Sequence, residues 1–287
     1  MLGRTTLLVV LCVSLPQSPL LAQSAYQGHN LEYNLIFPVF VMGGPDYFGP
    51  RLLLSNPQPG MTIAGTLYVF SQDGKPLRLY RDPMDDSSLT DGLSVSIPAG
   101  GSRAVGVYPE TGDLTVGWAL FNVTSSTVDV RTRVAGSVVT QYTRGDGTTG
   151  LVGVVAAHYE PGKHKRISIP VWLANGVDVG VALVNAGIAP LTVTCELRDQ
   201  GGTVVKSTAN TTSRISQLAP GQEVALFVSE IFPDFQVGNQ VFDGSLLIST
   251  DQEGLEAVGL LAFSGELTSI HTVHFAPLDS GAGKWDY

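Results

Sequence analysis

Four closely spaced aspartates form the segment of the sequence most suited to binding a metal: Asp82, Asp85, Asp86 and Asp91. Hard cations such as calcium bind clustered carboxylate oxygens. The spacing does not follow the calcium-loop pattern, however, and an acidic segment between two strands is commonly a solvated loop. The sequence therefore predicts a solvated loop and no cofactor, and it leaves calcium binding as the alternative.

Histidine and cysteine residues do not form a second cluster along the chain. His271 and His274 are three residues apart, which in a strand directs their side chains to opposite faces and disfavours joint chelation with His158 or His164. Cys195 lies in an alternating apolar run with no histidine nearby in the sequence. We therefore expect ordinary histidines and a small buried thiol at Cys195.

The sequence signatures of common enzymes are absent. The chain has no Gly-x-Ser-x-Gly elbow, no zinc-protease helix motif and no phosphate-binding loop. The two carboxylates of a glycosidase meet only in space, so an unrecognised hydrolase stays open as the least favoured interpretation. The sequence predicts a protein that is not an enzyme.

Carbohydrate binding would require aromatic side chains exposed on one surface. Trp118 and Trp172 lie in apolar strand segments, which predicts that both are buried in a core. Other aromatic residues lie near loops or strand ends and would be available for a contact surface: Tyr47, Phe48, Tyr80, Tyr108 and Tyr142. Nothing in the sequence arranges them into a site, so a ligand-binding surface is the second interpretation.

The elements that hold these residues are predicted to be short β-strands. In residues 114–120, Leu, Val, Trp and Leu alternate with small or polar residues, the pattern of a half-buried strand. Glycine-containing pairs at 73–74 and 201–202 are typical of hairpin turns. The one helical pattern is a single turn at 229–232, before Pro233. The sequence predicts an all-β fold of antiparallel β-sandwich type.

An internal repeat divides the chain. Five short segments recur in the same order at offsets of 121 to 132 residues, which indicates two copies of one domain-sized unit. We expect a first sandwich at 25–158 with an N-terminal extension strand, a second at 159–278, and a flexible tail at 279–287. The matching segments are 37–40 with 169–172, 54–56 with 183–185, 66–70 with 193–197, 97–100 with 218–221, and 117–120 with 244–247.

Residues 1–24 have the features of a cleaved signal peptide. Arg4 precedes the apolar run 5–15, and small residues at 22 and 24 fit a cleavage site. The apolar run is too short for a retained transmembrane helix. Cleavage removes Cys12 and leaves Cys195 without a partner for an intramolecular disulfide. We expect a secreted, periplasmic or cell-surface protein with no transmembrane segment in the mature chain.

Composition narrows the choice of partners. Charged residues are 14% of the chain and hydrophobic residues 44%, which excludes a disordered protein and supplies a sizeable core. Without Arg4 the chain has 15 basic and 25 acidic residues, a net charge of −10, which disfavours nucleic acid and anionic lipid. The remaining partners are a second copy of the chain, another extracellular protein or a polysaccharide.

Several motifs together resemble a known kind of protein. These are the Phe-Pro pair at 37–38, the Leu-x-Asn motif at 54–56, the segment Gly-Thr-Leu-Tyr-Val-Phe-Ser-Gln-Asp-Gly-Lys-Pro-Leu at 65–77, and Ile-Pro-Ala-Gly-Gly at 97–101. The pattern resembles secreted bacterial proteins of unknown role with tandem β-sandwich repeats. The resemblance implies two tandem sandwiches of immunoglobulin-like type, and export. Its motifs consist of turn and core residues, so it implies no functional residue.

The favoured function is a non-catalytic structural or adhesive module, outside the cell or on its surface, that self-associates through sheet edges. The alternating side chains of the N-terminal extension are the candidates for this contact, or else they cap their own domain. They are Leu31, Tyr33, Leu35 and Phe37. A carbohydrate- or ligand-binding sandwich is the alternative.

Overall fold

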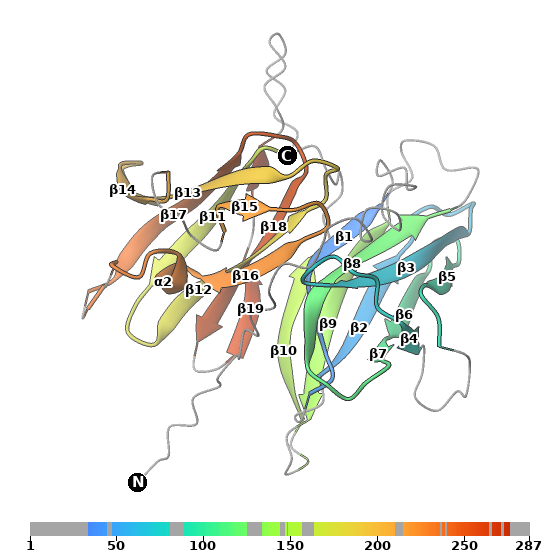
Figure 1. Ribbon diagram of the computed structural model, residues 1–287. Helices are drawn as coiled ribbons and strands as arrows, with labels where there is room; N and C mark the ends of the chain where they lie inside the picture. Colours follow the sequence, from blue (N-terminus) through green and yellow to red (C-terminus); the bar gives the residue numbers. More distant parts are fainter. Residues whose placement is uncertain are drawn as a thin grey trace.

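The structure is a computed structural model, in which the described residues form antiparallel β-sheets and one helical turn, joined by turns and loops (Figure 1). The all-β expectation is confirmed. The signal peptide, the tail, Leu31 and Tyr33 lie outside the described residues. Those residues are 34–44, 48–80, 89–124, 134–143, 147, 149–156, 164–209, 215–235, 237–238, 240–263, 266–270 and 273–275.

The N-terminal half of the chain forms a sandwich of two four-stranded sheets. Sheet A has the order β1-β8-β3-β5, with β1 (Leu35–Met42), β8 (Thr115–Val123), β3 (Ile63–Ser71) and β5 (Leu93–Ile97). Sheet B has the order β10-β9-β2-β6, with β10 (Thr149–Ala156), β9 (Ala135–Thr143), β2 (Phe48–Ser55) and β6 (Ser102–Gly106). A short ladder joins β4 (Leu79–Tyr80) to β7 (Tyr108–Pro109).

The C-terminal half forms a second sandwich. Sheet D has the order β14-β13-β17-β11-β20, and β15 pairs with the start of β13. Sheet E has the order β16-β12-β18-β19. The strands of sheet D are β14 (Val204–Ser207), β13 (Leu191–Asp199), β17 (Phe242–Thr250), β11 (Arg166–Leu173), β20 (Val273–Phe275) and β15 (Gln217–Leu218). Those of sheet E are β16 (Glu223–Phe227), β12 (Val177–Asn185), β18 (Leu255–Phe263) and β19 (Glu266–Ile270), and one helical turn, α2 (Val228–Ile231), follows β16.

The strands of the two sandwiches follow the same order. Sheet A corresponds to sheet D, with β1, β8, β3 and β5 matched by β11, β17, β13 and β15. Sheet B corresponds to sheet E, with β10, β9, β2 and β6 matched by β19, β18, β12 and β16. The recurring sequence segments fall on these matched strands or the turns beside them. The duplication and the predicted domain boundaries stay predictions.

Each sandwich has its own apolar core, built by alternation along its strands. In β11 the side chains of Ile167, Ile169, Val171 and Leu173 point into the second core, while the residues between them point outward. In β2, Leu52 and Leu54 point into the first core in the same way. Burial of these branched side chains is the main stabilising term in each sandwich.

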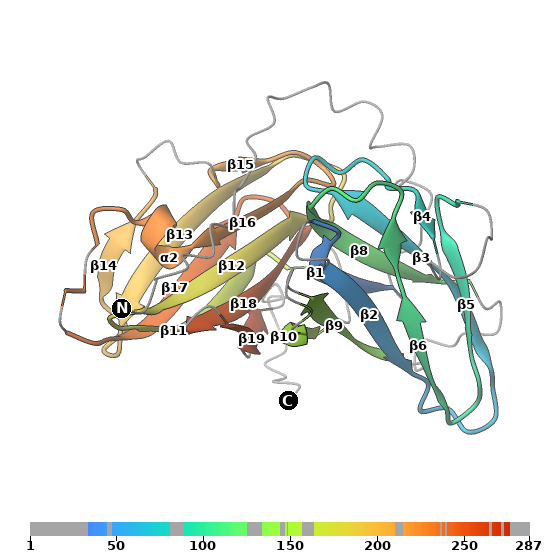
Figure 2. The ribbon, with the colours of Figure 1, turned by 90° about the horizontal axis from the view of Figure 1, so that it is seen from below.

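A third apolar layer joins the two sandwiches, because the outer face of sheet A contacts the outer face of sheet E. Ile36, Trp118 and Leu120 of sheet A contact Val184 of β12. Val39 of β1 contacts Ala182 and Val258 of sheet E. The apolar layers therefore follow the sheet order B, A, E, D, and β10 at the edge of sheet B also contacts β19 at the edge of sheet E. The two sandwiches lie side by side in both views (Figures 1 and 2).

A buried asparagine at the end of β2, and another at the end of β12, ties down the loop that follows. Asn56 donates its side-chain amide to the carbonyl oxygens of Met61 (2.7 Å) and Pro98 (3.2 Å) and accepts the N–H of Gln58 (2.9 Å). Asn185 donates to Ala189 (2.8 Å) and Leu218 (2.9 Å). The recurring Leu-x-Asn motif is thus a loop anchor.

Candidate interaction surfaces

Of the predicted metal and self-association residues, only Asp91, Leu35 and Phe37 lie in the part of the chain that the structure describes. Of the four aspartates, only Asp91 lies among the described residues, where its side chain is exposed and 3.7 Å from the Nε of Arg78. Asp82, Asp85 and Asp86 lie outside the described residues. Within the described part of the chain, no group of three or more His, Cys, Asp or Glu side chains is arranged to hold a metal ion.

Leu35 and Phe37 are buried in the core of their own sandwich, so they offer no surface to a second molecule. The choice between capping and self-association for the whole segment stays a prediction, because Leu31 and Tyr33 lie outside the described residues. The physical reason for the burial of Leu35 and Phe37 is pairing: β1 joins sheet A through β8, with Leu35 opposite Phe121 and Phe37 opposite Ala119. Once paired, the inward side chains of β1 complete the first core.

Cys195 lies in a core, and His164 contacts a buried carboxyl group. Cys195 is fully buried in the second core, and burial raises the pKa of its thiol to about 12, so the thiolate that a nucleophile needs is suppressed. The Nδ1 atom of His164 lies 3.1 Å from Oε1 of Glu256, which is buried on the sheet E face that meets sheet A. His158 and His271 lie outside the described residues.

The contact between sheets A and E is held by specific polar groups as well as apolar ones. Trp118 donates its indole N–H to the carbonyl oxygen of Gly221 at 2.8 Å and stacks on Phe70 at 4.3 Å between ring centroids. The backbone N–H of Glu223 donates to the carbonyl oxygen of Gln72 at 2.8 Å. Sequence alternation predicted a core position for Trp118. It is buried, but between the sandwiches.

Glu223 is the most unusual group in this interface. Its side chain is buried, and both carboxyl oxygens lack a well-formed hydrogen bond among the described residues. Burial raises the pKa of Glu223 to about 8, and the nearby Gln72 side chain only partly opposes this. Glu223 and Glu256 both pair in register with Val184, one on each side. Two buried carboxyl groups therefore occupy one row of the interface.

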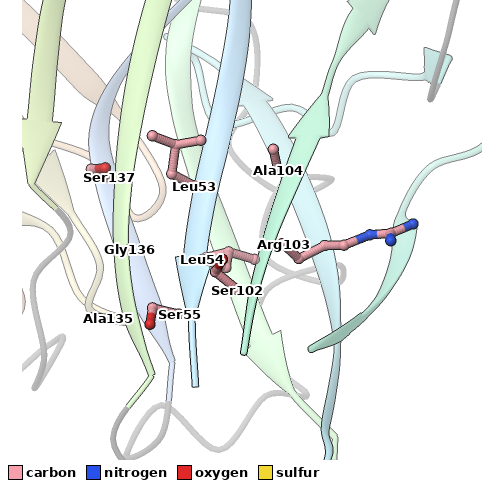
Figure 3. Close-up of a pocket in the computed structure, with 9 residues that line it drawn as sticks. All are labelled: Leu53, Leu54, Ser55, Ser102, Arg103, Ala104, Ala135, Gly136 and Ser137. Carbon is pink, nitrogen blue, oxygen red and sulfur yellow. The ribbon is translucent and has the colours of Figure 1, made fainter. Parts of the chain in front are cut away.

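The outer face of sheet B is exposed and carries a shallow depression of about 390 Å³ (Figure 3). Leu53 of β2 projects from the centre of this face and is 43% exposed. Its register partners are Ala104 of β6 and Ser137 of β9, so a large side chain is flanked by small ones. The next row consists of Ser55, Ser102 and Ala135.

The outer face of sheet D is exposed at the opposite end of the stack. Trp172 of β11 is 46% exposed, so the prediction that it is a core residue is wrong. Side chains alternate along β11, so Val171 and Leu173 point into the core and Pro170 and Trp172 point outward. Asp243, the register partner of Trp172, accepts a hydrogen bond from the side-chain amide of Gln200 at 2.9 Å. Alternation in 166–173 was the sequence signal for this exposure.

Among the described residues, no helix is long and apolar enough to cross a membrane.

Comparison with known proteins does not assign the chain to a family. No protein-family model matches it, and no curated protein matches it. Among solved structures, "Biofilm associated protein - B domain" is similar with a TM-score of 0.21 and 7% identity, over 86% of this chain and 87% of that chain. The lectin from Pleurotus ostreatus in complex with GalNAc has a TM-score of 0.18 and 11% identity, over 88% and 86%. TM-scores this low assign neither a fold nor a function.

Proposed function

We propose that the protein is a non-catalytic structural or adhesive module that works outside the cell or on its surface. The observation that carries the proposal is the buried contact between sheets A and E. Two independently cored sandwiches are joined through apolar side chains, the Trp118 hydrogen bond and two buried carboxyl groups. Such a contact favours a stiff rod of four sheets with an exposed face at each end.

Stiffness is useful in a spacer or adhesive element, because it holds a contact surface at a fixed distance and orientation. Interfaces between domains of one chain normally permit relative motion unless they are extensive and apolar. Here strands β1, β8 and β12 are buried on both faces along most of their length. An enzyme active site, in contrast, needs a cleft with accessible titratable groups, and Cys195, Glu223 and Glu256 are all buried.

The test measures where the protein is located, whether it supports adhesion, and whether its two sandwiches move relative to each other. Antibody labelling of intact cells and of the culture medium should detect the protein in at least one of them. A strain that lacks the gene should adhere less well, and the Trp118→Asp variant, whose interface contains an unpaired buried charge, should restore adhesion only in part. Small-angle scattering should show one rigid body for the wild type and a broader distribution for the variant. Protein confined to the cell interior, or unchanged adhesion in the deletion strain, would contradict the proposal.

A second candidate function, carbohydrate binding, is favoured by Trp172. An exposed indole ring can stack on the apolar face of a pyranose, while Asp243 and Gln200 beside it can hydrogen-bond hydroxyl groups. Titration with neutral oligosaccharides, followed by tryptophan fluorescence, tests this candidate. Binding that survives Trp172→Ala would exclude this surface as the binding site.

A further inference from the structure

We propose that molecules of this protein assemble head to tail, with the outer face of sheet D in one molecule seated on the outer face of sheet B in the next. This contact would repeat between molecules the contact that sheet A makes with sheet E within one molecule. The inference deepens the proposed structural or adhesive function by naming the partner as a second copy of the chain.

The first step is the correspondence of faces. Within the molecule, the outer face of sheet A meets the outer face of sheet E. Sheet D occupies the position of sheet A in the second sandwich, and sheet B occupies the position of sheet E in the first. The two exposed end faces are the outer faces of sheets B and D. Their counterparts by strand order, sheets E and A, contact each other in the middle of the molecule. A second molecule can continue the stack at either end.

The second step places Trp172 at a contact position. In β1, Val41 pairs with Val116 of β8, and Val41 contacts the apolar patch formed by Ala182 and Val258 on sheet E. In β11, the residue at the corresponding place is Trp172, which pairs with Asp243 of β17. Among the described side chains of sheet D, the exposed aromatic residue Trp172 thus corresponds to Val41, a residue of the A–E contact.

The third step places the depression on sheet B at the matching position. On sheet E, Ala182 pairs with Ala225 on one side and with Val258 on the other. On sheet B, the corresponding residue Leu53 pairs with Ala104 and Ser137. The row that receives Val39 inside the molecule therefore corresponds to the centre of the depression in Figure 3.

Shape and charge of the two end faces are complementary. Sheet D presents a projecting indole at Trp172, and sheet B presents small side chains around Leu53 that leave room for it. Apolar groups of unlike size interdigitate well in such contacts. Arg51, exposed on the same face as Leu53, and Asp243, exposed beside Trp172, carry opposite charges. These opposite charges would orient one molecule on the next.

A face contact of this kind is heterologous, because the two surfaces differ. Heterologous contacts form rings if the rotation between subunits closes, and open filaments if it does not. Addition of a strand at the free edge of β1 is disfavoured, because Pro38 lacks the N–H that such a strand would need. Strand β11 is not an edge strand, since it pairs with both β17 and β20.

The test uses one blocked face at a time. Trp172→Arg blocks the sheet D end and leaves sheet B intact, whereas Leu53→Arg does the opposite. Both side chains are exposed, so both variants should fold with unchanged circular dichroism and melting temperature. Analytical ultracentrifugation should show wild-type oligomers that lengthen with concentration. Each variant alone should self-associate roughly tenfold or more weakly, the effect expected for losing an interface tryptophan or its pocket.

An equimolar mixture of the two variants gives the sharpest outcome. The intact sheet D of the Leu53→Arg molecule can seat on the intact sheet B of the Trp172→Arg molecule, so the mixture should form one-to-one dimers that grow no further. Leu114→Arg is the matched control, because Leu114 is 41% exposed, close to the 43% of Leu53, and lies outside both end faces. This control should assemble like the wild type.

Three results would overturn the inference: a wild type that stays monomeric at every concentration, a variant mixture without dimers, or a Leu114→Arg protein as impaired as the other two. A monomeric wild type that still reaches the cell surface and supports adhesion would leave the proposed function intact. A monomer whose neutral-polysaccharide binding is lost in Trp172→Arg would instead identify Trp172 as a ligand-binding residue.

Discussion

Trp118 of the first sandwich donates its indole N–H to the carbonyl oxygen of Gly221 in the second sandwich, at 2.8 Å. These residues are separated by most of a domain in sequence and are both buried. The bond lies beside Phe70 and the Val184 contact, where it is shielded from water. A hydrogen bond in such surroundings fixes the register of one sandwich on the other.

Replacement of Trp118 by Phe should remove this bond while retaining most of the apolar contact. The Gly221 carbonyl oxygen would lose a buried donor, so we expect a loss of about 1–3 kcal/mol in the free energy of unfolding. Urea denaturation followed by circular dichroism measures it. Trp172→Phe is the control and should change stability by less than about 0.5 kcal/mol, because that ring is exposed. Equal losses in the two variants would refute the role of the bond.

The stability of the interface should depend on pH through Glu223. The pKa of Glu223 is raised from 4.5 to about 8 by burial, so the folded protein holds this proton over a range where the unfolded chain has lost it. The contribution of Glu223 to stability therefore falls as pH rises from about 4.5 to about 8, and it is constant beyond both limits. Other titratable groups add their own slopes, so the difference from a variant is the informative quantity.

Glu223→Gln removes this dependence and keeps the side-chain volume. Relative to the wild type, the variant should become more stable by a few kcal/mol between mildly acidic and alkaline pH, and the gain should be smallest below pH 4.5. Melting temperatures at a series of pH values measure the difference. Glu253→Gln, at an exposed position, is the control and should produce no such trend. A constant difference between wild type and Glu223→Gln at all pH values would contradict the assignment.

The two loop anchors should be equivalent in strength. Asn56→Ala and Asn185→Ala each leave several backbone groups without their buried partner, and we expect each to cost about 2–4 kcal/mol of stability. Hydrogen exchange should increase in the loop next to the changed residue. In the Asn56 variant, hydrogen exchange should stay unchanged around Leu218, whose carbonyl oxygen is bound by Asn185 and not by Asn56. Exchange that rises in both sandwiches would show that the anchors are not local.

A glycine at the same place in β8 and β17 should tolerate no side chain. A Cβ atom at Gly117 would overlap the carbonyl oxygen of Phe70, and one at Gly244 would overlap that of Arg198. Alanine at either position should destabilise the fold by about 1–3 kcal/mol or more, since the clash is with backbone. Gly112→Ala is the control, because a Cβ there meets no atom within 4 Å. Chemical denaturation of the three variants measures their stabilities. A Gly117→Ala protein as stable as the control would show that the backbone contact at this position is not close.

Local sequence patterns predicted the strands and the single helical turn, because alternation and glycine turns are local properties. They did not predict which way Trp118 points, since the run Trp118-Ala119-Leu120-Phe121 is apolar on both faces and has no polar residue to set a direction. Burial on both faces depends on a second sheet far away in sequence. The Leu-x-Asn motif could be recognised in the sequence. Its role as a loop anchor could not, because that role depends on where the loops bound by Asn56 and Asn185 lie in the fold.

The candidate surfaces were harder still to predict. Trp172 sits among Pro170, Val171 and Leu173, a short apolar run that suggests a core, and only the alternation of the whole strand turns it outward. The position of Leu53 above small residues depends on the pairing of β2 with β6 and β9, which no single segment encodes. The spacing of the four aspartates left calcium binding as an alternative to a solvated loop. Only Asp91 lies in the described part of the chain, so this choice stays a prediction.

The apolar outer face of sheet A also has a consequence for the order in which the two sandwiches fold. Synthesis proceeds from the N-terminus, and domains generally fold as units in that order. Until β12 and β18 exist, Ile36, Phe70, Trp118 and Leu120 form an uncovered apolar surface on the first sandwich. A chain that stops after β10 would keep this surface permanently and be prone to aggregate. Docking of the second sandwich therefore covers an apolar surface that the first sandwich cannot bury by itself.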